Sequence, residues 1–457
     1  MALFDAGDPR PLHFVGIGGA GMSALALLAR RRGVLVTGCD PDPSGAADVE
    51  ALGARVWVGH DPAHVEGARA VVASAAVPPG HPELARAAEL GIPVVPRKEA
   101  LARYIERGRT VAIAGTHGKT TTTAMTTEAL AGAGLAPTGI AGGRVGLWGG
   151  NALPGGDALF VVEADEYDRA FLELRPDVAV VTNVEADHLE VYGTLEAIED
   201  AFVQFAGPAA RVIACADDAG AMRVAARVAG AVWRYGTASD ADLRITDLSQ
   251  DAAGSRARVA LPDGTSVELR LRVPGLHNVR NAVAALGAAL ELGAAQEQVL
   301  GALAAFPGVG RRFERLGEAR GISVVDDYAH HPTELAATLT AARQAYPGRR
   351  IVAVFQPHLF SRTQAQGAAM GRALAAADLV IVTDIYAARE RPVPGVSGRI
   401  VSDGAEASGA SVVFVPERAA LFGKVAEVVR EGDVVLTLGA GDITRTGHEL
   451  MAWLQAA

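Results

Sequence analysis

The sequence predicts an α/β protein of three domains: an N-terminal Rossmann-like domain, a central P-loop-type domain and a C-terminal Rossmann-like α/β domain. Three observations support this prediction. The chain of 457 residues is too long to fold around one hydrophobic core, and at roughly 150 residues per domain it suggests about three domains. Short apolar runs alternate with helical stretches along the chain, which is typical of α/β folds. A glycine-rich loop follows an apolar strand in each of the first two segments.

The first segment, residues 1–107, has the pattern of a small parallel sheet. A strand is expected at 12–17, followed by glycines and a helix that ends near Arg30. Four more apolar runs with turn signals between them predict strands at 34–40, 54–59, 68–77 and 92–97. A charged helical stretch at 97–109 leads into the next segment.

The loop after the first strand reads GIGGAG, and its glycines fit a diphosphate site. The loop spans residues 16–21, and Asp40 ends the following strand, as in dinucleotide-binding proteins. Taken alone, this pattern predicts an NAD-dependent oxidoreductase. The physics is less specific, because glycines and a helix N-terminus suit any diphosphate, including that of a UDP-sugar. A purely structural turn is the alternative.

The second segment, residues 108–307, carries the sequence VAIAGTHGKTTT at 111–122. Strands are expected at 159–166, 178–188 and 211–218, and a strand-rich patch at 243–273 has a hairpin signal at Asp263-Gly264. A helix beginning near Asn278 closes this segment.

The loop in VAIAGTHGKTTT predicts a nucleotide phosphate site. Its glycines are closer together than in the common phosphate loop, where a glycine would occupy the position of Ile113. Loop amides and the helix N-terminus would surround the phosphates of ATP, and Lys119 would reach the outer ones. Lysine occurs only three times in the chain, whereas arginine is abundant. A capped helix after a plain turn is the alternative, and it does not explain the lysine.

Acidic residues that follow two neighbouring strands predict a metal site. Glu163 directly follows three apolar strand residues, and Asp187 and His188 end the next expected strand. The Thr120 hydroxyl, carboxylates and a histidine converging on phosphates could hold two Mg²⁺ ions. Such clusters are often solvated loop charge, and a lone His188 would more often be structural.

The third segment, residues 308–457, alternates apolar strands with helices and is expected to be doubly wound. Five strand candidates lie at 322–329, 350–356, 379–386, 411–416 and 433–442.

Composition narrows the classes of function. The net charge of −10 argues against a nucleic-acid partner. Two cysteines suit a reducing compartment, and no signal peptide or stretch for membrane insertion is expected. A cytoplasmic protein is therefore predicted.

The motifs together resemble the Mur ligases, the amide-forming enzymes of peptidoglycan synthesis. The resemblance extends from about residue 12 to about residue 445 and includes GTHGKTTT, VVEADEYDRAFLELRPDVAVVTNVEADHLEVYG, GLHNVRNAVAAL, GVGRRFE, DDYAHHPTE and GAGD. It implies an ATP- and Mg²⁺-dependent ligase that joins L-alanine to the lactoyl carboxylate of UDP-N-acetylmuramate through an acyl phosphate. A monomer or weak homodimer is expected.

The resemblance also implies roles for individual residues. The implied catalytic residues are Lys119, Glu163, His188 and His330, and the implied metal ligands are Thr120, Glu163 and His188. ATP would contact Gly115, Thr116, His117, Gly118, Lys119, Thr120, Thr121, Asn281, Arg312 and Asp327. The UDP-sugar and L-alanine would contact Gly16, Gly18, Gly19, Ala20, Gly21, Asp40, Ser74, Tyr328, His330 and Arg362. One departure concerns Leu359, where some family members carry an arginine, so Arg362 would be the main cation for the alanine carboxylate.

Three alternatives remain at this point. One is the related ligase that attaches a whole peptide to the same UDP-sugar, which would need a wider pocket in the third domain. The second is an NAD oxidoreductase with an accessory ATPase domain. The third is a catalytically silent binding protein, against which Lys119, Glu163 and His188 argue.

Overall fold

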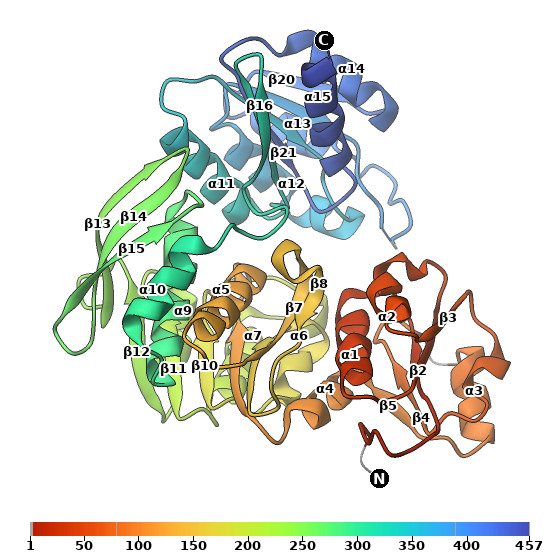
Figure 1. Ribbon diagram of the computed structural model, residues 1–457. Coiled ribbons are helices and arrows are strands. Elements are labelled where there is room, and N and C mark those ends of the chain that lie inside the picture. Colours follow the sequence, from red (N-terminus) through yellow and green to blue (C-terminus); the bar gives the residue numbers. More distant parts are fainter. Residues whose placement is uncertain (1–2, 79, 389, 457) are drawn as a thin grey trace. The chain divides into compact units, whose positions relative to one another are not determined.

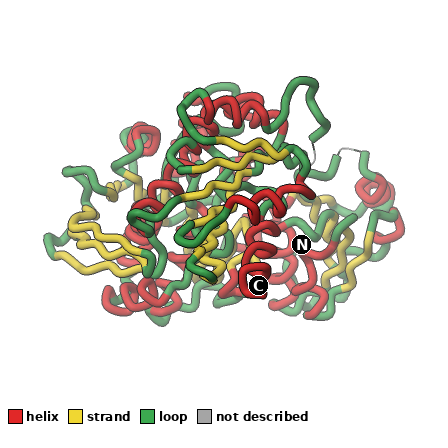
Figure 2. The backbone as a smooth tube through the Cα atoms, turned by 90° about the horizontal axis from the view of Figure 1, so that it is seen from above, coloured by secondary structure: helices red, strands yellow, loops and turns green. Residues whose placement is uncertain are grey.

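The computed structural model describes residues 3–78, 80–388 and 390–456 (Figure 1). The described chain forms two compact units. The first unit comprises the chain up to Thr246 together with Arg258–Leu269 and Arg280–Phe306. The second comprises Asp247–Ala257, Arg270–Val279 and the chain from Pro307 onward. Three sheets with helices between their strands confirm the predicted α/β fold class (Figure 2).

The N-terminal sheet is fully parallel, with the strand order β3-β2-β1-β4-β5. Its strands are β1 (Leu12–Val15), β2 (Val36–Asp40), β3 (Arg55–Val58), β4 (Ala70–Ala73) and β5 (Val94–Pro96). Its helices are α1 (Ala20–Arg31), α2 (Ala47–Ala51), α3 (Pro82–Glu89) and α4 (Arg97–Ile105). The chain reverses its direction of winding between β1 and β4, and ligands of such sheets bind at the carboxyl ends of strands beside this switch.

The central sheet has ten strands in the order β15-β14-β13-β12-β11-β10-β6-β9-β7-β8. They are β6 (Arg109–Ala114), β7 (Thr138–Val145), β8 (Gly150–Leu153), β9 (Leu159–Glu163), β10 (Val178–Val181), β11 (Arg211–Cys215), β12 (Ala231–Gly236), β13 (Leu243–Asp251), β14 (Gly254–Ala260) and β15 (Ser266–Leu271). The helices are α5 (Lys119–Gly132), α6 (Leu189–Tyr192), α7 (Leu195–Ala206), α8 (Ala219–Ala225), α9 (Leu276–Glu291) and α10 (Gln296–Ala305). β6 pairs in parallel with both β9 and β10, so the loops after these three strands meet at one edge.

The C-terminal sheet has the order β16-β17-β21-β18-β19-β20. Its strands are β16 (Glu314–Ala319), β17 (Ile322–Asp327), β18 (Ile351–Phe355), β19 (Leu379–Thr383), β20 (Val412–Val415) and β21 (Val434–Leu438). The helices are α11 (Pro332–Ala345), α12 (Phe360–Leu374), α13 (Arg399–Glu406), α14 (Arg418–Val428) and α15 (Thr444–Ala456). Two buried clusters pack on this sheet, one including residues of α11 and α12 and the other residues of α14 and α15.

Several strands were not expected from the sequence. β16 reads ERLGEA and is mostly polar, and it pairs antiparallel with β17 at the edge of its sheet. β7 and β8 are rich in glycine and small residues, which weaken the strand pattern. The hairpin at Asp263-Gly264 is confirmed, since Gly264 has a φ of 83° between β14 and β15. Within the described residues, no helix combines the length and apolar character needed to cross a membrane.

Candidate active site

The loop between β6 and α5 is held tightly against the segment that follows β10. Gly115 has a φ of 146°, and a Cβ there would lie 1.9 Å from Oγ1 of Thr182. Gly118 has a φ of 80°, and a Cβ there would lie 2.8 Å from Oδ1 of Asn281. The amide of His117 donates to Oδ1 of Asn183 at 2.7 Å. The shortened loop therefore needs glycine at both ends, and it places α5 with its N-terminus at the sheet edge.

Lys119 is the first residue of α5, and its ammonium group is buried in an ion pair. Nζ lies 2.7 Å and 2.8 Å from the two carboxylate oxygens of Glu166 and 2.6 Å from the carbonyl oxygen of Gly115. Burial acts to lower the pKa of Lys119, but the carboxylates of Glu166, Asp165 and Glu163 outweigh burial and raise it. Lys119 is therefore a permanently charged cation at the helix N-terminus.

Glu163, the last residue of β9, provides an oxygen-rich site beside α5. It lies opposite Ile113 in the parallel register of β6 and β9. Oγ1 of Thr120 donates to Oε1 of Glu163 at 3.1 Å, and the amide of Gly142 donates to Oε2 at 2.6 Å. Burial raises the pKa of Glu163 despite these bonds and the charge of Lys119.

The donor set of Thr120 and Glu163 fits Mg²⁺. A hydroxyl and a carboxylate are oxygen ligands, which Mg²⁺ prefers, and it combines them with phosphate oxygens and water. A raised carboxylate pKa also means that the fold leaves the charge of Glu163 incompletely compensated, and a divalent cation would compensate it.

His188 is the N-cap residue of α6 and adopts a left-handed conformation with a φ of 53°. Its Nε2 lies 3.8 Å from Oδ2 of Asp187, and its ring packs edge-on against Tyr167 at a centroid distance of 5.2 Å. A left-handed conformation at a non-glycine residue is sparsely populated and occurs often at functional sites. The role of His188 as a metal ligand stays a prediction.

Asn281 lies beside the phosphate loop. It is a buried residue on α9, and its side-chain oxygen lies close to Gly118. The structure thus brings together Lys119, Thr120, Glu163 and Asn281 from three separate segments of the first unit, α5, β9 and α9.

The first glycine loop lies at the switch point of the N-terminal sheet. The amide of Gly18 donates to Oδ2 of Asp40 at 3.0 Å. A Cβ at Gly16 would lie 3.3 Å from Cβ of Ser74, at the end of the neighbouring strand β4. A Cβ at Gly21 would lie 2.7 Å from Nη1 of Arg97, which therefore places a guanidinium over the first turn of α1. Gly19 is the N-cap of this helix and Ala20 its first residue.

A cavity of about 360 Å³ opens next to this loop. Residues that line it include Ser74, Arg97, Lys98, Asp165, Tyr167 and Asp168. Nζ of Lys98 lies 3.4 Å from Oδ2 of Asp168. Two cations and two carboxylates therefore line this cavity, and Lys98 is paired with Asp168, so the guanidinium of Arg97 beside Gly21 is the group placed to meet an anionic ligand.

In the second unit, Asp327 is the last residue of β17, and His330 follows three residues later. Oδ2 of Asp327 accepts from the amide of Phe313 at 2.7 Å, and Oδ1 accepts from the amide of Ala329 at 2.8 Å. Burial raises the pKa of Asp327 to about 6. Burial lowers the pKa of His330 to about 4. The positive charge of Arg362 also lowers this pKa, whereas the negative charge of Glu334 raises it. The imidazole of His330 is therefore neutral at pH 7.

The ring of Tyr328 makes a cation–π contact with Arg312. The guanidinium of Arg312 lies 5.0 Å from the centre of the Tyr328 ring, and its Nη1 lies 3.7 Å from Oε1 of Glu334. Arg362 is on the first turn of α12, which begins after Leu359. Leu359 has a φ of 68°, a conformation that is strained for a leucine.

Sequence reasoning missed two charged residues of these sites. Glu166 pairs with Lys119, and the only sequence signal was its place in the acidic run that follows β9. Arg97 directly follows β5, so its position at a strand's carboxyl end could have indicated the same sheet edge as GIGGAG.

Three family models match consecutive parts of the chain. Residues 11–109 match the Mur ligase family, catalytic domain; residues 113–289 match the Mur ligase middle domain; and residues 311–441 match the Mur ligase, glutamate ligase domain. Together they cover most of the sequence.

Curated relatives match along nearly the full length. A UDP-N-acetylmuramate–L-alanine ligase from Kineococcus radiotolerans is 49% identical over 96% of this chain and 95% of the relative. Another ligase of the same name, from Mycolicibacterium vanbaalenii, is 47% identical over 97% of this chain and 96% of the relative. The solved UDP-N-acetylmuramate–alanine ligase of Thermotoga maritima is 31% identical, with a TM-score of 0.83 over 98% of this chain and 99% of that one. A murein peptide ligase from Psychrobacter arcticus is 25% identical, with a TM-score of 0.71 over 97% and 98%.

Proposed function

The chain belongs to the Mur ligase family, and from this premise we propose that it joins L-alanine to the lactoyl carboxylate of UDP-N-acetylmuramate in peptidoglycan precursor synthesis. Relatives with this activity in their names match nearly the whole chain at 46–49% identity. The observation that carries the proposal on the structural side is the contact of Thr120 with Glu163 beside buried Lys119. This arrangement suits a reaction that activates a carboxylate with ATP.

We infer that the loop from Gly115 to Thr121 holds the phosphates of ATP. Backbone amides at the start of α5 would face the phosphates, and the helix dipole favours their negative charge. The ammonium of Lys119 would exchange its ion pair with Glu166 for the outer phosphates, since both are anionic oxygen donors. Asn281 lies next to Gly118 and would contact the adenine edge.

Thr120, Glu163 and His188 would hold Mg²⁺, which supplies charge compensation for the phosphates during phosphoryl transfer. Glu163 is fixed for this role by its bond from the amide of Gly142. The carboxylate of the sugar substrate would attack the γ-phosphorus as the bond to the ADP oxygen breaks, which gives an acyl phosphate and ADP. Lys119 and the α5 amides would stabilise the charge that develops in that step. The amine of L-alanine would then attack the acyl carbon and displace phosphate.

The UDP-sugar site is proposed at the cavity beside GIGGAG. Gly16, Gly18, Gly19, Ala20 and Gly21 would contact the diphosphate through their backbone. Asp40 positions this loop by accepting from Gly18. Ser74, Arg97 and Lys98 line the cavity, and their hydroxyl and cationic groups suit a sugar diphosphate.

The amino-acid site is proposed in the second unit. Arg362 would bind the alanine carboxylate, with Tyr328 beside it and Arg312 and Asp327 directed to the nucleotide. His330 is a neutral imidazole with its Nδ1 3.0 Å from the carbonyl oxygen of Tyr328. Its Nε2 could accept the proton of the attacking amine, because a neutral imidazole has a free lone pair. The domain boundaries proposed for these three sites are 1–107, 108–307 and 308–457.

The experiment that tests the function is a measurement of ADP formation with every combination of substrates. ADP is expected only when UDP-N-acetylmuramate and L-alanine are present together. Replacing L-alanine with a tripeptide should reduce ADP formation to background, because relatives that match nearly the whole chain are named as L-alanine ligases. ATP turnover that needs neither substrate, or a preference for the tripeptide, would contradict the proposal.

A further inference from the structure

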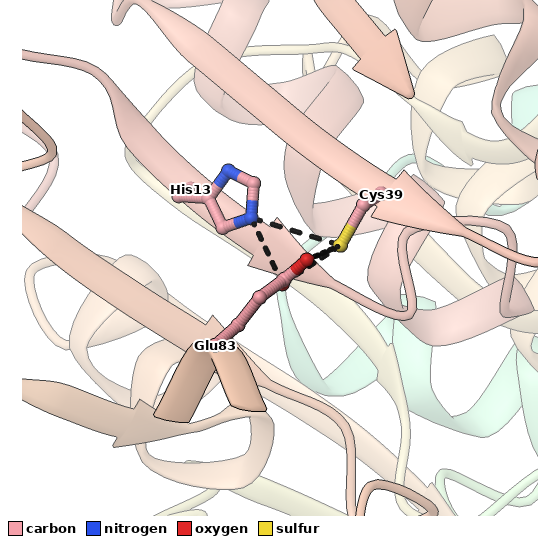
Figure 3. A group of neighbouring side chains, drawn as sticks. All are labelled: His13, Cys39 and Glu83. Carbon is pink, nitrogen blue, oxygen red and sulfur yellow. Dashed lines mark hydrogen bonds and ion pairs between the residues drawn. The ribbon is translucent and has the colours of Figure 1, made fainter. Parts of the chain in front are cut away.

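A buried group of three side chains that can bind a metal lies in the N-terminal domain, and none of the three is among the residues assigned above to the ligase reaction. His13 is on β1, Cys39 is on β2 and Glu83 is in the first turn of α3 (Figure 3). All three are fully buried. Cys39 is the parallel partner of Val15, two residues from His13, so the side chains of His13 and Cys39 point to the same face of the sheet.

The three donor atoms have the spacing of a metal's coordination shell. Nε2 of His13 lies 3.4 Å from Oε2 of Glu83 and 3.7 Å from Sγ of Cys39. Bond lengths of about 2.0–2.3 Å in tetrahedral zinc sites place neighbouring donors roughly 3.3–3.6 Å apart. The third separation, 2.9 Å from Sγ to Oε2, is that of an S–H···O hydrogen bond, and it would lengthen once the thiol proton leaves.

The Glu83 carboxylate is held in place from several sides. It accepts from the amide of Asp61 at 2.9 Å, and it lies 2.9 Å from Sγ of Cys39 and 3.0 Å from Nδ1 of His64. A carboxylate and a thiol that can lose its proton offer two negative charges in a fully buried group, and a divalent cation would neutralise both.

We propose that Nε2 of His13, Sγ of Cys39 and the Glu83 carboxylate bind one Zn²⁺ ion. The S–H bond of Cys39 breaks as the sulfur–zinc bond forms, and the proton goes to solvent. The single ring proton of neutral His13 is then on Nδ1, which donates to Oγ1 of Thr37, so that the lone pair of Nε2 binds the ion. Thiolate and carboxylate then carry two negative charges that match the ion, and no group is oxidised or reduced. A mixed set of sulfur, imidazole and carboxylate donors suits Zn²⁺ better than Mg²⁺ or Ca²⁺, which prefer oxygen alone.

Further side chains orient the three ligands, as in established metal sites. Oγ1 of Thr37 lies 2.9 Å from Nδ1 of His13, which leaves Nε2 directed at the group. Nδ1 of His64 lies 3.0 Å from Oε1 of Glu83. Nδ1 of His60 lies 3.2 Å from the Cys39 sulfur. The His60 side chain is 25% exposed, so it also marks a route from solvent.

The site would brace the first glycine loop. The carbonyl oxygen of Cys39 accepts from the amides of Gly16 at 2.9 Å and Ile17 at 3.1 Å. A metal bond to the Cys39 side chain would therefore hold β2, β1 and α3 together below the loop. Zinc is expected to raise the melting temperature of the protein.

Cobalt provides a direct test, because Co²⁺ bound to a thiolate absorbs through sulfur-to-cobalt charge transfer. The purified full-length protein, stripped of metal and titrated with Co²⁺ alone, should develop this absorption at one equivalent, and Zn²⁺ should abolish it. The chain has only two cysteines, both buried and free, which gives a matched pair of variants. Cys39→Ser should lose the absorption, whereas Cys215→Ser should keep it.

The Mg²⁺ site cannot imitate this signal, because it offers no sulfur. Zinc affinity, measured by competition with a chelator, should fall at least about 100-fold in Cys39→Ser.

No thiolate absorption in the wild type, or its persistence in Cys39→Ser, would overturn the proposal. If Cys39→Ser does not fold, X-ray absorption of the zinc-loaded wild type decides: one sulfur ligand supports the site and nitrogen and oxygen alone refute it. The test uses no nucleotide, so its failure would leave the ligase proposal intact.

Discussion

At the scale of single residues, the ion pair of Lys119 with Glu166 shows how the nucleotide site can be stable before ATP binds. The Glu166 side chain is buried and that of Lys119 is only 13% exposed, and an isolated charge at such a position would be costly. Glu166 therefore compensates the lysine until phosphate oxygens replace it.

Replacing Lys119 should separate catalysis from UDP-sugar binding. Lys119→Ala is expected to lower kcat by about 100- to 1,000-fold, the range for losing one stabilising charge or donor in a transition state. Its Kd for UDP-N-acetylmuramate, measured by calorimetry, should change little, since Lys119 does not line the cavity beside GIGGAG. Lys424→Ala removes the charge of a lysine in an exposed pair and should keep full activity. Lost UDP-sugar binding in folded Lys119→Ala would contradict the separate sites.

Replacing Glu166 should destabilise the nucleotide-free protein. Glu166→Gln leaves Lys119 buried without its counter-charge, at an expected cost of about 3 kcal/mol in the free energy of unfolding. Saturating ATP should recover much of this loss, because the phosphates supply negative charge. Urea denaturation with and without ATP measures both effects. The matched change Glu427→Gln, opposite exposed Lys424, should cost about 0–1 kcal/mol. Equal costs for the two variants would show that the buried pair is unimportant.

At the scale of elements, the turn from β6 to α5 accepts no side chain at its first glycine. Gly115→Ala would place a Cβ 1.9 Å from Oγ1 of Thr182, in a backbone conformation that L-residues avoid. Gly134 also has a positive φ, 78°, but a Cβ there would meet no atom within 4 Å. Gly134→Ala should therefore cost about 1 kcal/mol, whereas Gly115→Ala should cost about 3 kcal/mol or more and weaken ATP binding. Thermal unfolding of the two variants checks this, and equal losses would contradict it.

Asp327, the last residue of β17, and His330, three residues later, have pKa values that are shifted in opposite directions. The pKa of Asp327 rises from 3.8 to about 6 on burial, so the folded protein holds this proton more tightly than the unfolded chain does. The pKa of His330 falls from 6.5 to about 4 on burial, so the folded protein holds that proton less tightly. Between pH 4 and pH 6 the two effects on stability nearly cancel.

Replacing either residue should expose the effect of the other one on the pH dependence of the free energy of unfolding. In His330→Gln, stability relative to wild type should rise by about 3 kcal/mol as the pH falls from 6.5 to 4, because the unfavourable charging of His330 is gone. In Asp327→Asn, stability relative to wild type should fall by about 3 kcal/mol between pH 6 and pH 4. Denaturation curves across this range, compared with wild type, remove the contributions of all other groups. Slopes of the same sign in both variants would contradict the opposed pKa shifts.

At the scale of the whole molecule, parallel sheets were predictable from the sequence, whereas some edge strands and contacts between distant segments were not. Apolar runs followed by glycine or acidic residues located β1, β6, β9 and β17. β16 was missed because its sequence, ERLGEA, is mostly polar and lacks the apolar run of its neighbour β17, although the two strands are adjacent in sequence. The site was predictable where a motif is local, as in GTHGKT, and not where pairing is long-range, as for Lys119 with Glu166.

The most direct measurement of the central claim follows one oxygen atom through the reaction. UDP-N-acetylmuramate carrying ¹⁸O in its lactoyl carboxylate would be incubated with ATP and L-alanine, and the released phosphate analysed by mass spectrometry. An acyl phosphate requires that one carboxylate oxygen leaves with the phosphate, so each phosphate should gain one ¹⁸O. Phosphate without ¹⁸O, formed at the same rate as the amide product, would contradict the account.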